Sequence, residues 1–199
     1  MKQRRIIIAL IQAFWLVVGG GVALAHVTPP VVLISDRDAV LAMTAGAKKF
    51  FVREVRLTPN EREALRQQRG WQPDEDFYRF YLGRDDAGKL VTAVMFLTEV
   101  TIHGPVRVAV GLGPDGKVKD AKVVELSEET FPWLKPLIDL DFTRDYVARD
   151  SRASFGLSQR VEQMHLESMP LFYAQIVASL IQRAALLFDL TLLKRDGKI

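Results

Sequence analysis

The side chains that could carry chemistry in this chain are few, and cysteine is not among them. The 199 residues contain no cysteine and three histidines. The lack of cysteine excludes disulfides, iron–sulfur clusters, thiolate zinc sites and c-type haem attachment. The sequence also has no Ser/His/Asp or metalloprotease pattern. A redox function would therefore need a flavin, a quinone or copper.

Three short segments hold the candidate binding residues. They are His103-Gly104-Pro105 at the entry to a predicted hairpin, Glu128-Glu129-Thr130-Phe131-Pro132-Trp133 after it, and Leu166 to Leu171 before the last helix. Each segment also has an ordinary structural explanation: a turn glycine, aromatic side chains that fill a core, and a serine that caps a helix. The aspartates between positions 139 and 150 lack the spacing of a calcium loop and indicate a solvated surface.

A β-hairpin is the clearest element that would position these segments. Apolar residues alternate over 106–112, Gly113-Pro114-Asp115-Gly116 supplies a turn, and Val118 to Leu126 follows as the returning strand. We expect strands over most of residues 77–126. The turns at 84–88 and 113–116 are too short for a crossover, so the sheet should be antiparallel.

Helices are predicted on both sides of the strand region. Ser35-Asp36-Arg37-Asp38 begins a helix that should end near Phe51, and Thr58-Pro59-Asn60-Glu61 is a capping box whose helix should stop at Gly70. Apolar residues at three- and four-residue steps over 171–188 predict a long amphipathic C-terminal helix docked on the sheet. The fold class that follows is α+β, an antiparallel sheet with a β-hairpin core packed against helices.

The first 25 residues have the parts of a secretory signal or an uncleaved anchor. Three basic residues precede the apolar run Ile6 to Val18, and Ala23-Leu24-Ala25 is a cleavage signature that would leave His26 as the first residue. The stretch 6–25 is also long enough to span a bilayer. Either case predicts an exported protein. Without residues 1–25 the chain has 24 basic and 24 acidic residues, so its charge gives no indication of nucleic acid as a partner.

The hairpin and its flanks resemble the FMN-binding domain family. The order Ile102-His103-Gly104-Pro105, strand, Gly-Pro-Asp-Gly-Lys-Val turn, strand and Glu-Glu-Thr is similar to the core of that family. Its members include extracytoplasmic flavoprotein subunits of sodium-pumping quinone reductases and Rnf complexes. The resemblance covers residues 55–188 and includes Leu57-Thr58-Pro59-Asn60-Glu61, Phe77 to Leu82 and Gly88 to Val91.

This resemblance implies an FMN site, with Thr130 bonded to the edge of the isoalloxazine ring and Phe131 or Trp133 stacked on it. In many family members a threonine before the last helix is esterified to the FMN phosphate. Residues 164–171 contain no threonine, and Ser168 is their only hydroxyl, so FMN should be held non-covalently. The expected cofactor-binding residues are His103, Gly104, Glu129, Thr130, Phe131, Ser168 and Met169.

The expected organisation is a signal peptide or anchor over 1–25, an N-terminal helical segment over 26–54, and an FMN-binding-like domain over 55–199. The expected function is periplasmic electron transfer between FMN and a membrane redox complex or a soluble partner. A flavin-free binding or assembly module of a membrane complex stays open as an alternative. A remote alternative is a copper protein that uses amino-terminal His26, with His103 or His165 as a further ligand.

Overall fold

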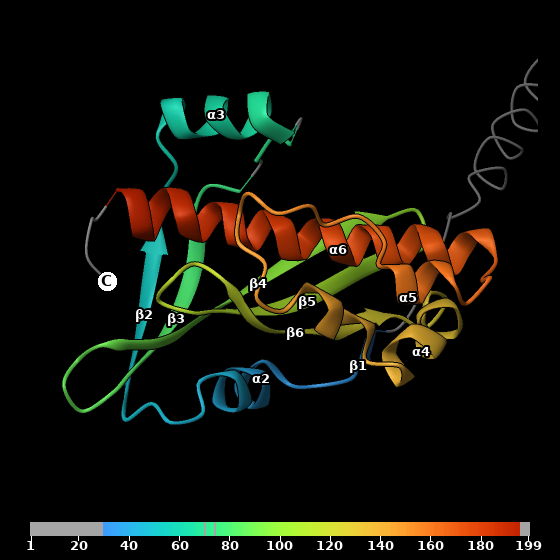
Figure 1. The fold of residues 1–199 in the computed structure, drawn as a ribbon, viewed down its shortest axis with the longest axis horizontal. Coiled ribbons are helices and arrows are strands. Elements are labelled where there is room, and N and C mark those ends of the chain that lie inside the picture. The colour runs from blue at the N-terminus through green and yellow to red at the C-terminus, as the bar shows by residue number, and fades with distance from the viewer. Residues whose placement is uncertain (1–29, 70, 74, 196–199) are drawn as a thin grey trace, which may run out of the picture.

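The computed structural model describes residues 30–69, 71–73 and 75–195. These residues form a six-stranded antiparallel sheet in the order β1-β6-β5-β4-β3-β2, with helices on both faces (Figure 1). The predicted α+β class is confirmed. The expected signal or anchor over 1–25, and His26, lie outside the described residues.

The strands are β1 (Pro30–Val32), β2 (Lys49–Val55), β3 (Tyr78–Arg84), β4 (Leu90–Thr101), β5 (Gly104–Leu112) and β6 (Val118–Ser127). The α-helices are α2 (Asp36–Met43), α3 (Pro59–Arg69), α4 (Phe131–Asp139), α5 (Gln159–Glu162) and α6 (Ser168–Phe188). A 3-10 helix η1 (Phe142–Tyr146) precedes α5, and a π-helix η2 (Asp189–Lys194) continues α6.

The predicted hairpin is strands β5 and β6, and the strand meander from β3 to β6 is confirmed. A second hairpin joins β4 to β5, with Cα partners from Ala93↔Leu112 to Thr101↔Gly104. Only Ile102 and His103 lie between the last paired residues. We call residues 100–104 the β4–β5 tip. Because β3 pairs with β4 only as far as Met95, the last residues of β4 extend past β3.

The predicted helix that begins after Ser35 is shorter than expected. Ser35 caps it by accepting a hydrogen bond from the Asp38 amide at 3.2 Å, but α2 ends at Met43 and not near Phe51. Residues 49–55 instead form edge strand β2, which pairs with β3. The segment expected to be helical over 26–54 thus supplies both edge strands of the sheet in addition to α2, because Lys49–Val55 is rich in aromatic and β-branched residues that favour strands.

The capping box before α3 is confirmed. The Thr58 amide donates to Glu61 Oε2 at 2.7 Å, and the Glu61 amide donates to Thr58 Oγ1 at 3.3 Å. Two free amides at the helix start are satisfied reciprocally, as the sequence predicts.

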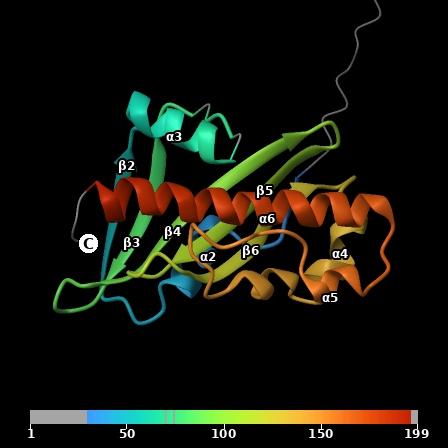
Figure 2. The same ribbon diagram turned by 45° about the horizontal axis from the view of Figure 1, so that its top comes forward.

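Helix α6 lies across one face of the sheet and forms the centre of the main core (Figures 1 and 2). With η2 it makes a continuous 27-residue helix, long and apolar enough to cross a membrane by length and composition. Inside the fold, 61% of its most apolar window is buried, so we interpret it as the core helix. On the other face, Ala39 and Met43 of α2 pack against Val94, Ala109 and Val124.

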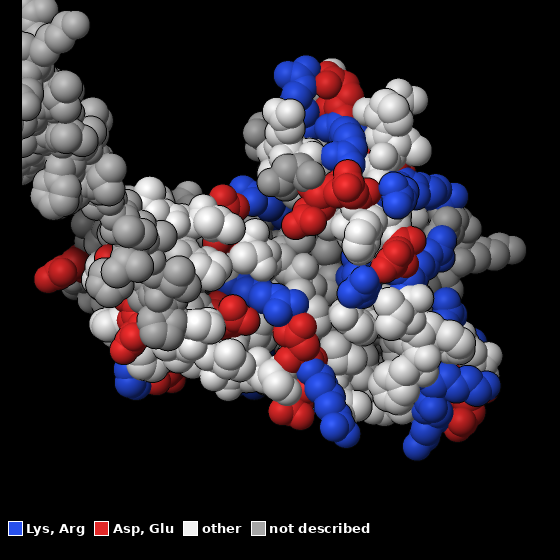
Figure 3. Space-filling model, turned by 180° about the vertical axis from the view of Figure 1, so that it is seen from behind, with Lys and Arg blue, Asp and Glu red and all other residues white. Residues whose placement is uncertain are grey.

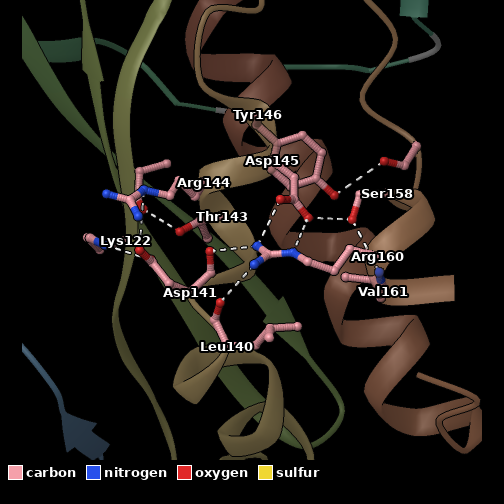
Figure 4. A network of polar contacts seen from close by, with 12 residues as sticks. Lys122, Leu140, Asp141, Thr143, Arg144, Asp145, Tyr146, Ser158, Arg160 and Val161 are labelled. Atoms are coloured by element: carbon pink, nitrogen blue, oxygen red, sulfur yellow. Dashed lines mark hydrogen bonds and ion pairs between the residues drawn. The ribbon is translucent and has the colours of Figure 1, made fainter. Parts of the chain in front are cut away.

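A polar network holds the segment between β6 and α6 in place (Figure 4). Lys122 on β6 bonds Asp141 at 2.7 Å, and the Arg160 guanidinium donates to the carbonyls of Leu140 and Asp141 and bonds the Asp145 carboxylate. These contacts connect the sheet, the end of α4 and α5. They therefore fix the segment that leads into the start of α6.

Candidate functional site

A groove of about 880 Å³ opens between the β4–β5 tip and the N-terminal half of α6. We call it the tip groove. Its apolar side chains come from both elements: Val100, Ile102, Met169, Phe172 and Ile176. Polar groups are placed among them, including His103 from the tip and Gln175 and Ser179 from α6. A largely apolar groove with a few polar groups is the usual composition of a small-molecule site.

The Thr101 hydroxyl fixes the shape of the tip and ties it to α6. It donates to the Gly104 carbonyl at 2.8 Å, accepts from the His103 amide at 3.1 Å, and lies 3.0 Å from the Tyr173 hydroxyl. A hydroxyl has one hydrogen, and here Gly104 receives it, so Tyr173 must be the donor to Thr101. Burial raises the pKa of Tyr173, which keeps this phenol protonated and able to donate.

Gly104 is required at the tip by conformation and by space. Its φ is +101°, and a Cβ atom built there would lie 2.7 Å from Cβ of Ser127. The Ser127 hydroxyl in turn donates to the His103 carbonyl. The glycine therefore allows β6 to approach the tip closely and hold it by a hydrogen bond.

His103, which lines the groove, pairs with Glu129, and its Nδ1 lies 2.7 Å from Glu129 Oε1. Because an ionised carboxylate only accepts, Nδ1 carries the hydrogen and donates. Nε2 is then the ring nitrogen that Glu129 does not use. The prediction placed both residues at the site, and the structure brings them together.

Trp133 connects this pair to the helix. Its ring meets the His103 ring edge-on at a centroid distance of 5.0 Å and stacks on Tyr173 at 5.6 Å with an interplanar angle of 21°. The tip, α4 and α6 are thus joined by one run of rings. Trp133, one of the two residues expected to stack on a flavin ring, stacks on Tyr173 in this structure.

Thr130 has a structural role that the sequence prediction did not anticipate. It is fully buried, its hydroxyl donates to the Ser127 carbonyl at 3.1 Å, and its amide donates to Ser127 Oγ at 3.2 Å. The expected bond from Thr130 to a flavin edge is therefore corrected, because this side chain holds the turn between β6 and α4. Phe131, the first residue of α4, is partly buried against the main core.

The two residues predicted at the start of the last helix differ in position. Met169 lines the tip groove, whereas Ser168 is exposed as the first residue of α6. The alternative role of Ser168 as the N-cap is wrong, since Glu167 occupies the cap position and its side chain makes no capping bond.

Several residues that line or adjoin the groove are not among the binding residues predicted from the sequence. Tyr173 lies among the apolar residues of α6, and only its hydroxyl, which bonds Thr101, indicates a polar role. Ile102 belongs to the segment Ile102-His103-Gly104-Pro105 that carries the family resemblance, but it is not among the predicted binding residues. Arg183, whose Nη1 lies 2.5 Å from Glu99 Oε2, looks from sequence like a solvated helix charge.

A second groove, of about 840 Å³, lies where β3 and β4 separate. Three of its lining residues are arginines (79, 107 and 183), and each is paired with a carboxylate, at N–O distances of 2.7, 2.8 and 2.5 Å. Figure 3, seen from behind, shows positive and negative side chains interleaved over this face of the molecule. We favour the tip groove as the site because it contains sequence-predicted residues.

Within the described part of the chain, no group of three or more histidine, aspartate or glutamate residues could hold a metal ion. His26, the basis of the copper alternative, lies outside that part. No protein-family model, curated protein or solved structure matches the chain.

Proposed function

We propose that the tip groove binds FMN non-covalently and that the protein transfers electrons. The observation that carries this proposal is the convergence of His103 and Met169, predicted from separate segments, on one apolar groove. Glu129 supports the His103 ring, and Gly104 shapes the tip behind it. The volume of about 880 Å³ lies within the range of roughly 300–1,000 Å³ typical of ligand sites.

The groove suits a flat ring with apolar faces and polar edges. Val100, Ile102 and Phe172 offer apolar contacts, while His103 Nε2 and Gln175 offer hydrogen bonds to ring nitrogen or oxygen atoms. When bound, FMN would supply the one- and two-electron chemistry. The protein would hold and orient the ring and exclude water from its faces.

The phosphate would lie near the start of α6, where free amides and the positive end of the helix dipole favour an anion. Ser168 is exposed there, but Pro170 provides no amide hydrogen. Glu167 adds a negative charge at the same helix end. These features support weak, non-covalent phosphate binding.

The protein would work in the periplasm, with a membrane redox complex or a soluble protein as electron partner. This location rests on the apolar segment and cleavage signature in residues 6–25. A flavin-free assembly module would use the same groove for an apolar ligand.

Variants on the groove test the proposal. His103→Ala should raise the dissociation constant for FMN by roughly 5- to 30-fold, because one hydrogen bond of about 1–2 kcal/mol is lost. Phe172→Ala should also weaken binding, whereas Phe51→Ala, at a similarly exposed phenylalanine on edge strand β2, should leave it unchanged. Affinity would be measured by quenching of FMN fluorescence. Equal affinity in all three variants and the wild type would remove the tip groove as the flavin site.

A further inference from the structure

We propose that the tip groove opens onto a lipid bilayer, with Val100, Ile102 and Phe172 as the residues that contact it. We call these three residues the tip patch. The same three side chains also line the proposed FMN site, but bilayer contact is tested below by a measurement that needs no flavin.

The tip patch exposes large apolar side chains from two elements at one place. Ile102 is 95% exposed, Val100 77% and Phe172 54%, and all three line the tip groove. Scattered exposed apolar residues are common, but a group of them around one opening indicates a contact surface. Figure 2 shows the β4–β5 hairpin projecting beyond its neighbouring strands, so its end can meet a flat surface.

The path of the chain places this patch beside an apolar sequence segment. Strand β1 begins at Pro30, whose Cα partner is Ser127, and the Ser127 hydroxyl donates to the His103 carbonyl in the tip. Only residues 26–29 separate Pro30 from the apolar stretch that ends at Ala25. Five residue steps span at most about 18 Å. In the uncleaved case, an anchor made by residues 6–25 would therefore hold the tip close to the membrane surface.

The charges around the patch favour apolar contact over electrostatic adsorption. Glu128, Glu129 and Glu167 are exposed next to the tip or at the start of α6. Carboxylates would repel an anionic surface, so the anchor and the apolar side chains would provide the attachment. We therefore expect contact with phosphatidylcholine that anionic lipid does not strengthen.

The absence of cysteine from the sequence allows a direct test. Ile102→Cys and Val100→Cys, each labelled with bimane, would be reconstituted as the full chain in phosphatidylcholine vesicles containing nitroxide-labelled lipid. The matched control is Val52→Cys on β2, which is 59% exposed at the opposite edge of the sheet from β1. The labels at 100 and 102 should lose fluorescence to the nitroxide lipid, and the label at 52 should not.

Two results would overturn the proposal. The first is a label at 102 that the nitroxide lipid quenches no more than the label at 52. The second is a label at 102 that is shielded from a water-soluble quencher but untouched by nitroxide lipid, which would assign the tip patch to a protein partner. Circular dichroism of each labelled variant would verify that the fold is retained.

Discussion

Gly104→Ala should destabilise the protein more than Gly88→Ala, although both glycines have positive φ. Gly104 has φ +101° and Gly88, in the turn between β3 and β4, has φ +82°. A Cβ atom at Gly88 would meet no atom within 4 Å, whereas one at Gly104 would lie 2.7 Å from Cβ of Ser127. Gly88→Ala therefore carries only the backbone cost of a positive φ, whereas Gly104→Ala adds a steric overlap with Ser127.

The two costs can be sized separately. An L-residue in the left-handed region costs about 1–2 kcal/mol. Overpacking against a neighbour that cannot move freely costs about 1–3 kcal/mol more. Gly88→Ala should therefore lower the free energy of unfolding by about 1–2 kcal/mol and Gly104→Ala by about 2–5 kcal/mol.

Urea unfolding followed by circular dichroism would measure both values. Adding Ser127→Gly to Gly104→Ala should recover part of the loss, because it removes the overlapping Cβ atom, although the hydrogen bond to the His103 carbonyl goes with it. If Gly104→Ala costs no more than Gly88→Ala, β6 does not approach the tip as described, and the reasoning about the shape of the groove fails.

Substitutions at four further positions test the core, the buried turn and the polar network. Leu180→Ala, at a buried position of α6, should cost about 2–5 kcal/mol in urea unfolding, whereas Phe172→Ala on the exposed face of the same helix should cost less than about 0.5 kcal/mol. Thr130→Ala should cost about 1–2 kcal/mol by the same assay, since a buried hydroxyl loses its hydrogen bonds; a neutral result would contradict the role assigned to this residue. The hydrogen bond from Lys122 lowers the pKa of Asp141 below its unfolded value of 3.8. The stabilisation of the fold by this pair is therefore present above pH 3.8 and is lost as the pH falls through the lower pKa of the folded state. Asp141→Asn should therefore cost about 0.5–1 kcal/mol at neutral pH, a small value because the pair is partly exposed, and the difference from wild type should vanish in acid; a difference that persists in acid would exclude the ion pair as its cause.

Elements with a strong local signal could be predicted from the sequence. The β5–β6 hairpin, the capping box at Thr58 and Glu61, and helix α6 all depend on residue spacing within the element itself. Strand β2 has aromatic and β-branched residues that favour a strand, but six of its seven residues are exposed, so it shows no alternation of buried and exposed positions that would identify it. Its pairing with β3 depends on residues about thirty positions away.

The candidate site was predictable only in part for a related reason. His103 and Glu129 lie in short segments that the sequence singles out, and the structure brings their side chains together. The burial of Thr130 depends on how the end of β6 meets α4, and the bond between Thr101 and Tyr173 joins residues 72 positions apart. Such contacts arise from tertiary packing, which no short sequence pattern records.

The proposed function requires the tip groove to hold FMN without a covalent bond. Its most direct test is the visible spectrum of the full chain purified after export, before and after denaturation in acid. We expect a flavin spectrum and complete release of the yellow colour by acid, or saturable quenching of added FMN if the cofactor is lost on purification. A folded, colourless protein that leaves FMN fluorescence unchanged would contradict it, and so would flavin that stays attached to the denatured chain.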